Sequence, residues 1–289
     1  MSKLTLSASI LLFLVSCLSS NMVSKKQGNK QELFNGKDFT GWVKYIGVPH
    51  KSLQLSLPKD SLGNYKNPIG NEDFLKVFSV VREDGEPAIF VNGKVFGTIT
   101  SEATYENYHI TLQYKWGVKK FAPRLQLPRD AGLLYHAGDM PMQNRVWPLA
   151  QECQIQQGDC GDYWKIDKSM AHIPAVYKDS NWIYSVNADY VWFGNEVKRP
   201  RCMKSPDNEK PQGEWNTVEV YTSGDSSVHV VNGIIVMHLK DLSVSDSGTK
   251  KPMTKGRIVL QSEGAELYYR RIILEPIKQL PVSLRRLYK

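Results

Sequence analysis

Short runs in which hydrophobic and polar residues alternate make up most of the chain after Glu32. An alternating run rich in Val, Ile, Tyr, Trp and Thr predicts a half-buried β-strand. Asn232-Gly233 lies between two apolar runs and fits a type I′ turn, so residues 228–237 are predicted to form a hairpin. Few stretches show a helical period. Further strands are predicted at residues 108–116, 132–136, 152–156, 217–221, 257–261 and 268–274.

This pattern predicts one all-β domain with long loops, most simply a two-sheet sandwich over residues 31–278. Residues 57–71 contain Pro and Gly at several positions and are expected to form a loop. Residues 163–212 are expected to be long and mostly irregular. Several aromatic residues in this second stretch argue that it is an ordered, packed loop: Trp164, Trp182, Tyr184, Tyr190, Trp192 and Phe193.

The N-terminus has the features of an export signal. Lys3 precedes an apolar run over residues 10–15, which is too short for a membrane span of about 20 residues. Ser16-Cys17 follows, so Leu14 to Cys17 forms a lipobox in which Cys17 is lipidated and becomes the new N-terminus. The alternative is plain secretion with a coincidental cysteine. Residues 1–17 are thus expected to be a lipoprotein signal peptide and residues 18–30 a flexible tether. We expect an exported periplasmic or cell-surface lipoprotein held at a membrane.

The composition and net charge are consistent with an exported all-β domain and point to no further partner. The 289 residues are 41% hydrophobic and 10% aromatic, enough for a sizeable core, and the formal net charge is +8. Part of the excess lies in residues 279–289, expected to be a basic C-terminal tail, and part in residues 198–204. Neither cluster is interleaved with stacking aromatics as in a nucleic-acid groove, so no nucleic-acid partner is expected. A solvated basic face is favoured, with attraction to anionic lipid as the alternative.

Three cysteines remain beside Cys17. Cys153 lies in an alternating strand and is predicted to point into the core. Cys160 and Cys202 lie in loop-like segments, and export makes a bridge chemically possible, so a Cys160–Cys202 disulfide is predicted. No Cys or His spacing indicates structural zinc.

The segment from Trp147 to Asp159 carries the most chemistry. Alternation places Glu152, Gln154 and Gln156 on one face of a strand, with Cys153 and Ile155 facing the core. Carboxamides both donate and accept hydrogen bonds, as recognition of sugar hydroxyls requires. We therefore predict a sugar-binding face; an ordinary solvated sheet face is the alternative.

Several residues near this strand in sequence are further candidates. His136 either faces the same cleft or is structural, and Trp164 either stacks on a sugar ring or packs its loop. Glu152 with Asp162 or Glu263 could form the carboxylate pair of an ordinary glycosidase. The additional predicted contacts are Arg124, Tyr135, Asp162 and Gln261.

Five segments together resemble the 3-keto-disaccharide hydrolase family, whose members are also described as 3-keto-glucoside 1,2-lyases and 3-keto-2-hydroxyglucal hydratases. The opening LFNGKDFTGW at residues 33–42 is similar to that family's first motif. The resemblance extends over about Glu32 to Glu275. The other matching segments are residues 131–136, 152–159, 213–216 with 231–233, and 256–272.

The resemblance implies a concanavalin A-like jelly-roll sandwich and a sugar substrate oxidised at C3 by a partner dehydrogenase. A ketone at C3 acidifies the C2 hydrogen, so a base can form an enolate that expels the C1 aglycone. We assign the base to Glu152 or His136, enolate support to Arg124, and sugar contacts to the carboxamides, Tyr135, Asp162 and Trp164. A divalent metal held by His136 and a carboxylate could also stabilise the enolate, although no spacing demands one.

Two other functions stay open at this point. One is a two-carboxylate hydrolase of ordinary glycosides, and the other is a non-catalytic carbohydrate-binding lipoprotein.

Overall fold

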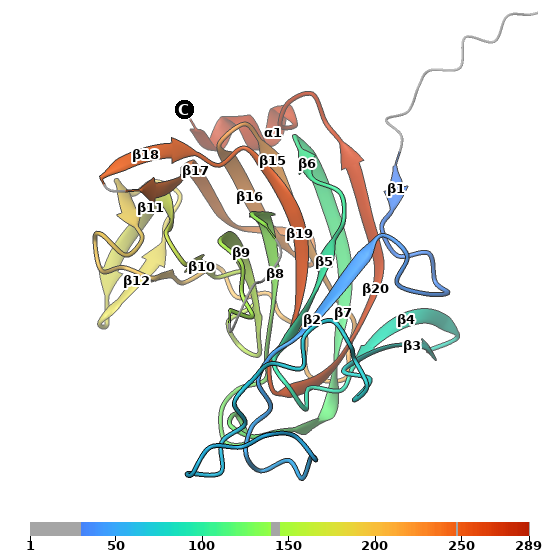
Figure 1. Cartoon of the computed structure of the whole chain (residues 1–289). Helices are drawn as coiled ribbons and strands as arrows, with labels where there is room; N and C mark the ends of the chain where they lie inside the picture. The colour runs from blue at the N-terminus through green and yellow to red at the C-terminus, as the bar shows by residue number, and fades with distance from the viewer. Residues whose placement is uncertain (1–29, 140–144, 247, 289) are drawn as a thin grey trace, which may run out of the picture.

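Two antiparallel β-sheets face one another in the computed structural model, which describes residues 30–139, 145–246 and 248–288 (Figure 1). The first sheet has 12 strands, nine of them along one path. In order they are β12 (Asn181–Tyr184), β11 (Ser169–Lys178), β17 (Ile234–Asp246), β16 (Ser226–Val231), β15 (Asn216–Ser223), β7 (Tyr108–Lys120), β20 (Ala265–Pro276), β4 (Glu86–Val91) and β3 (Phe78–Glu83). Three strands branch from it: β1 (Gln31–Glu32) on β20, β13 (Tyr190–Phe193) on β11, and β18 (Thr249–Pro252) on β17.

The second sheet has eight strands and carries the polar row predicted above. Its order is β14 (Arg201–Cys202), β10 (Tyr163–Ile166), β9 (Ala150–Gln156), β8 (Asp130–Ala137), β19 (Lys255–Ser262), β5 (Gly97–Ser101) and β2 (Trp42–Ile46), with β6 (Tyr105–Glu106) paired to β19.

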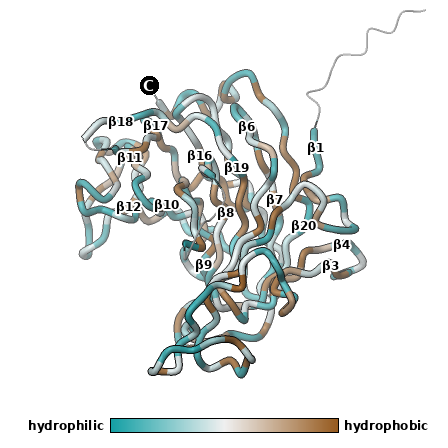
Figure 2. The backbone as a smooth tube through the Cα atoms, viewed as in Figure 1, coloured by the Kyte–Doolittle hydropathy of each residue, from teal (hydrophilic) through white to brown (hydrophobic). Residues whose placement is uncertain are grey.

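The hydrophobic core lies between the sheets and follows the alternation of their strands. Leu112 of β7 and Val218 of β15 are paired and fully buried in the first sheet. Leu133 of β8 and Cys153 of β9 are paired in the second sheet and belong to the same cluster. Along the tube of Figure 2, the strands through the middle of the molecule carry the strongest brown. The jelly-roll β-sandwich expected from the sequence is therefore confirmed.

The predicted strands are all present, and the hairpin turn has the expected backbone. Asn232 and Gly233 both have positive φ, 49° and 79°, as a type I′ turn requires. The prediction for residues 163–212 was wrong in one respect. This stretch contains five strands: β11, β12 and β13 belong to the first sheet, and β10 and β14 to the second.

The C-terminal segment folds back on the first sheet. It contains α1 (Val282–Arg285) and the 3₁₀ turn Arg286–Tyr288. Leu280 and Leu284 pack with Val228 and Val230 of β16 in a second apolar cluster, and the Tyr288 hydroxyl donates to the Ser227 carbonyl at 2.6 Å. Within the described ranges no helix is long and apolar enough to cross a membrane. Cys17 and the signal segment lie outside those ranges.

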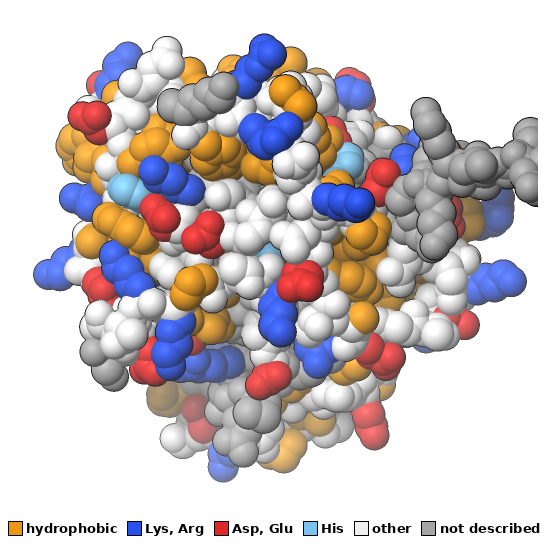
Figure 3. Space-filling view, turned by 90° about the horizontal axis from the view of Figure 1, so that it is seen from above, with side chains coloured by type: hydrophobic (Ala, Val, Ile, Leu, Met, Phe, Trp, Pro, Cys, Tyr) orange, Lys and Arg blue, Asp and Glu red, His pale blue; other side chains and the backbone are white. Residues whose placement is uncertain are grey.

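The predicted Cys160–Cys202 disulfide is wrong: both residues are fully buried free thiols, as is Cys153. Cys202 lies on β14 opposite Tyr163, whereas Cys160 lies in the turn after β9, beside Tyr114 of the other sheet. Lysines and arginines are spread over the face shown in Figure 3 rather than gathered in one patch.

Candidate active site

The candidate site is a cavity of about 430 Å³ on the outer face of the eight-stranded sheet. Three neighbouring strands, β9, β8 and β19, form its floor. Gln154 pairs with Gly132, and Leu133 pairs with Leu260, so Gln261 lies beside Gly132 in the next row. The lining residues are Arg124, Leu127, Pro128, Asp130, Trp147, Glu152, Gln154, Gln156, Asp159, Trp164, Ile166, Arg201, Gln261 and Glu263.

Gly132 allows two polar side chains to meet over the floor. A Cβ at this position would overlap the Oε1 atoms of both Glu152 and Gln261. The two oxygens therefore occupy the space that any larger residue would fill. The Gln261 oxygen is buried and has no hydrogen-bond partner among the described residues.

Arg124 holds a cluster of acidic and amide groups at one end of the cavity. Its guanidinium lies 2.6 Å from Asp130 Oδ2, 3.5 Å from Glu263 Oε1, and 3.3 Å from Gln156 Oε1. An isolated β-bridge joins Asp130 to Glu263, which brings the two carboxyls together. Asp130 Oδ1 is buried and has no partner among the described residues.

Burial shifts the protonation of these acids. Loss of solvent raises the pKa of Asp130 to about 7, against the pull of Arg124. It also raises the pKa of Glu263 to about 8, and the nearby Asp130 charge adds to that rise. Burial raises the pKa of Glu152 well above its usual range, and the nearby charges of Glu263 and Asp130 add to the rise; no cation of the described residues is paired with it. Burial thus favours the protonated form of all three carboxyls, least strongly for Asp130, which lies against Arg124.

A second arginine lies on the opposite wall. Arg201 Nε donates to the fully buried Asp162 at 2.6 Å, and its Nη2 lies 2.7 Å from Asp159. The guanidinium lies 5.7 Å from the ring centre of Trp164, which lines the same wall. Asp162 also accepts the Lys204 backbone N–H at 2.8 Å. Asp162 therefore fixes the position of Arg201 and does not itself line the cavity.

The structure brings together seven of the residues considered from the sequence: Arg124, Glu152, Gln154, Gln156, Trp164, Gln261 and Glu263. Tyr135, predicted to contact sugar, lies in the core between the sheets instead. Its hydroxyl pairs with Ser227 at 2.8 Å and with His229 at 3.0 Å.

His136 does not line the cavity either. A β-bulge at the end of β8 and a φ of 50° turn its ring inward, where it packs edge-on against Tyr108 and Tyr135. Desolvation lowers the pKa of His136 to about 4, so burial favours the neutral ring.

Sequence reasoning missed Asp130, Trp147, Asp159 and Arg201. Asp130 had a usable signal, because it lies two residues before Gly132 and alternation places both on the outer face. Arg201 had none, since only the pairing of β14 with β10 brings it to the cavity.

In the part of the chain that the structure describes, no three His, Cys, Asp or Glu residues are arranged to hold a metal ion. The metal pair considered from the sequence, His136 with a cavity carboxylate, is not assembled.

Comparison with family models identifies the domain. A model described as a 3-keto-alpha-glucoside-1,2-lyase-like domain matches residues 29–275. The chain belongs to this family. The match covers the whole sandwich and agrees with the family suspected from the sequence motifs. A comparison with curated proteins finds no match.

Solved structures with a similar chain path include carbohydrate-active proteins. A proposed glycosyl hydrolase from Parabacteroides distasonis is 19% identical, with a TM-score of 0.48 over 86% of this chain and 94% of that one. A family 16 endo-glucanase from Bacteroides ovatus is 12% identical, with a TM-score of 0.43 over 85% and 98%. The carbohydrate-binding module CBM66 from Bacillus subtilis is 9% identical, with a TM-score of 0.40 over 68% and 91%.

Proposed function

We propose that this protein cleaves 3-keto-glycosides by removing the C2 proton and eliminating the C1 aglycone. The observation that carries this proposal is the buried pair of Asp130 and Glu263 against Arg124, with the buried carboxyl of Glu152 lining the same cavity. With a pKa of about 7, Asp130 can lose its proton near neutral pH, whereas burial favours the protonated form of Glu152, and Arg124 lies against Asp130. Elimination beside a ketone needs a base, a proton donor and a stabiliser for the enolate.

The reaction balances without an oxidant or reductant. The base takes the C2 proton, and the electron pair of that C–H bond forms the enolate of the C3 ketone. The enolate then re-forms the ketone and a C1–C2 double bond while the C1–O bond breaks. The leaving oxygen takes a proton from an acid. Addition of water to the enone gives the free 3-keto sugar, so the net result is hydrolysis.

We assign the base to Asp130. Its pKa of about 7 is close to neutral, where a carboxyl is both available as the anion and basic enough to accept a proton. Its Oδ2 pairs with Arg124, whereas its Oδ1 has no hydrogen-bond partner among the described residues. Arg124 faces the same reacting carbons and supports the enolate charge.

We assign the proton donor to Glu152, which the sequence analysis favoured as a base. We change its role from base to proton donor because of the groups around its carboxyl. Without an opposing cation, the buried carboxyl favours the protonated form at neutral pH. His136, the other base considered, packs in the interior. Gln154, Gln156 and Gln261 bind sugar hydroxyls, and Trp164 stacks on the ring.

The test varies the leaving group. Glu152→Gln should lower kcat/KM for methyl 3-keto-α-glucoside by about 10²–10⁴-fold, the usual contribution of a positioned proton transfer. A 4-nitrophenol leaving group needs no proton, so with 4-nitrophenyl 3-keto-α-glucoside the loss should be under about tenfold. Equal losses with both substrates would return Glu152 to the role of base. No turnover of either substrate by the wild type would reject the proposed function.

We further propose that the protein works outside the cytoplasm as a lipoprotein anchored through Cys17, supplied with substrate by a sugar 3-dehydrogenase. The support is the lipobox at residues 14–17 and the need for a substrate already oxidised at C3. Labelled palmitate should enter the wild type and not Cys17→Ala; equal labelling would reject the anchor.

A further inference from the structure

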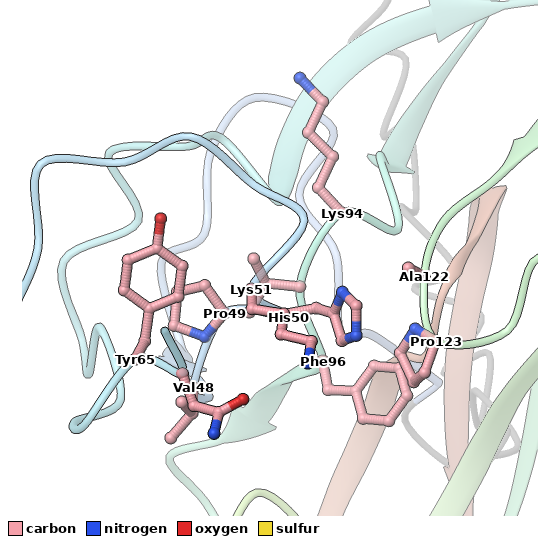
Figure 4. A pocket seen from close by; sticks show the side chains of 11 residues that line it. Val48, Pro49, His50, Lys51, Tyr65, Lys94, Phe96, Ala122 and Pro123 are labelled. Carbon is pink, nitrogen blue, oxygen red and sulfur yellow. The ribbon is translucent and has the colours of Figure 1, made fainter. Parts of the chain in front are cut away.

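A second hollow, of about 270 Å³, opens next to the candidate active site. It is formed where the loop after β2 meets the residues before β5 and the turn before Arg124. Figure 4 shows Phe96 and Pro123 close together, with Pro49 and Tyr65 on the other side of the hollow. Nothing in the chemistry proposed above uses these residues.

The two cavities share a wall. Gly97 at the start of β5 pairs with Ser262 at the end of β19. The chain neighbours of this pair are Phe96, which lines the hollow, and Glu263, which lines the cavity. The Phe96 ring stacks on Trp147, with centroids 6.2 Å apart, and Trp147 lines the active-site cavity. Pro123 immediately precedes Arg124. A ligand that extends from the cavity across β19 and β5 therefore enters the hollow.

The chemistry of the hollow differs from that of the cavity. Among the described residues, its lining contains no carboxylate, no glutamine and no arginine. The Tyr65 hydroxyl is already committed to the backbone, since it donates to the Leu53 carbonyl at 2.6 Å and accepts the Leu55 N–H at 2.8 Å. His50 Nδ1 is paired with Ser52 at 2.9 Å. Lys51, Lys94 and Asn64 also line the hollow. The apolar surfaces of Phe96, Pro49 and Pro123 suit a flat apolar group better than a ring of hydroxyls.

We propose that this hollow is the aglycone subsite and that it takes an aromatic aglycone rather than a second sugar. This inference rests on the proposed function, because the 3-keto ring must occupy the acidic cavity. The aromatic ring stacks on Phe96 while the glycosidic oxygen stays near the carboxyl cluster. The preferred substrates are then aryl or arylalkyl 3-keto-glucosides.

The test compares benzyl and methyl 3-keto-α-glucosides, whose leaving alcohols have similar basicity. Wild-type kcat/KM should be about tenfold or more higher for the benzyl substrate, the usual size of one aromatic contact with a ring. Phe96→Ala should reduce this ratio to near one. Phe90→Ala is the matched control, because the Phe90 ring packs against Tyr268 in the other sheet, with centroids 5.0 Å apart; this variant should keep the wild-type ratio. A 3-keto-disaccharide should behave like the methyl substrate.

The outcomes separate the two proposals. Turnover of both glucosides with equal kcat/KM, or an unchanged ratio in Phe96→Ala, overturns the aromatic subsite and leaves the reaction intact. A strong preference for the 3-keto-disaccharide overturns it in favour of a second sugar. If no 3-keto-glucoside is cleaved at all, the proposed function itself fails.

Discussion

Replacing Gly132 by alanine tests whether the meeting of Glu152 and Gln261 over β8 is needed for activity. The new Cβ would stand 2.1 Å from Glu152 Oε1, 2.3 Å from Gln261 Oε1 and 3.0 Å from Gln261 Cδ. Both side chains must therefore retreat by about 1 Å, and a displacement of that size at reacting groups typically costs about 100-fold in rate. Because flexible side-chain ends move rather than backbone, unfolding should become easier by only about 1–2 kcal/mol.

The assay measures kcat/KM on a 3-keto-glucoside together with urea unfolding. Gly138→Ala is the matched control, since its Cβ would meet only the Leu149 carbonyl oxygen at 3.7 Å and Leu149 Cβ at 3.9 Å, which are ordinary contacts. Gly138→Ala should change activity less than about twofold and stability by no more than about 0.5 kcal/mol. The reasoning is refuted if Gly132→Ala keeps near-normal activity, or if both variants lose activity equally.

The remaining predictions concern protonation, the second arginine and the thiols. The pKa of Glu263 is raised from 4.5 to about 8 in the folded protein, so the stability that its retained proton provides is present below pH 4.5 and is lost as pH rises through 8. The unfolding free energy of Glu263→Gln should therefore increase relative to that of the wild type between pH 4.5 and 8. A difference in unfolding free energy that does not change with pH counts against a buried, protonated Glu263. Asp162→Asn leaves Arg201 without its buried partner and should lower the free energy of unfolding by about 3 kcal/mol. Asp159→Asn, at a partly exposed ion pair, should lower it by about 1 kcal/mol or less. Equal losses in urea unfolding would disprove the positioning role of Asp162. In denaturant without reductant, Cys153, Cys160 and Cys202 should all react with a thiol reagent; reaction of a single thiol would indicate a disulfide.

The part of the site that the sequence could predict is the part governed by alternation along one strand. Glu152, Gln154 and Gln156 share a face because side chains repeat every two residues in a strand, and Cys153 and Ile155 consequently pack in the core. The same rule, applied to β8, places Asp130 and Gly132 outward and Tyr135 inward. Tyr135 was therefore a predictable error.

Other features depend on contacts that no local pattern contains. His136 lies in a β-bulge, which interrupts the alternation and turns the ring into the core. Asp162 follows Gly161, whose φ of 99° redirects the chain so that the carboxyl is buried beneath Arg201. Burial raises the pKa values of Asp130 and Glu263, and the Asp130 charge raises that of Glu263 further, where β8 meets the end of β19.

The most direct test of the account incubates the wild-type protein in deuterium oxide with methyl 3-keto-α-glucoside and, separately, with methyl α-glucoside. Elimination followed by hydration predicts cleavage of the ketone alone, with deuterium at C2 of the 3-keto sugar by NMR. Cleavage of the unoxidised glucoside at a similar rate, or release of methanol from the ketone with the C2 hydrogen retained, would contradict removal of the C2 proton and indicate an ordinary glycoside hydrolase.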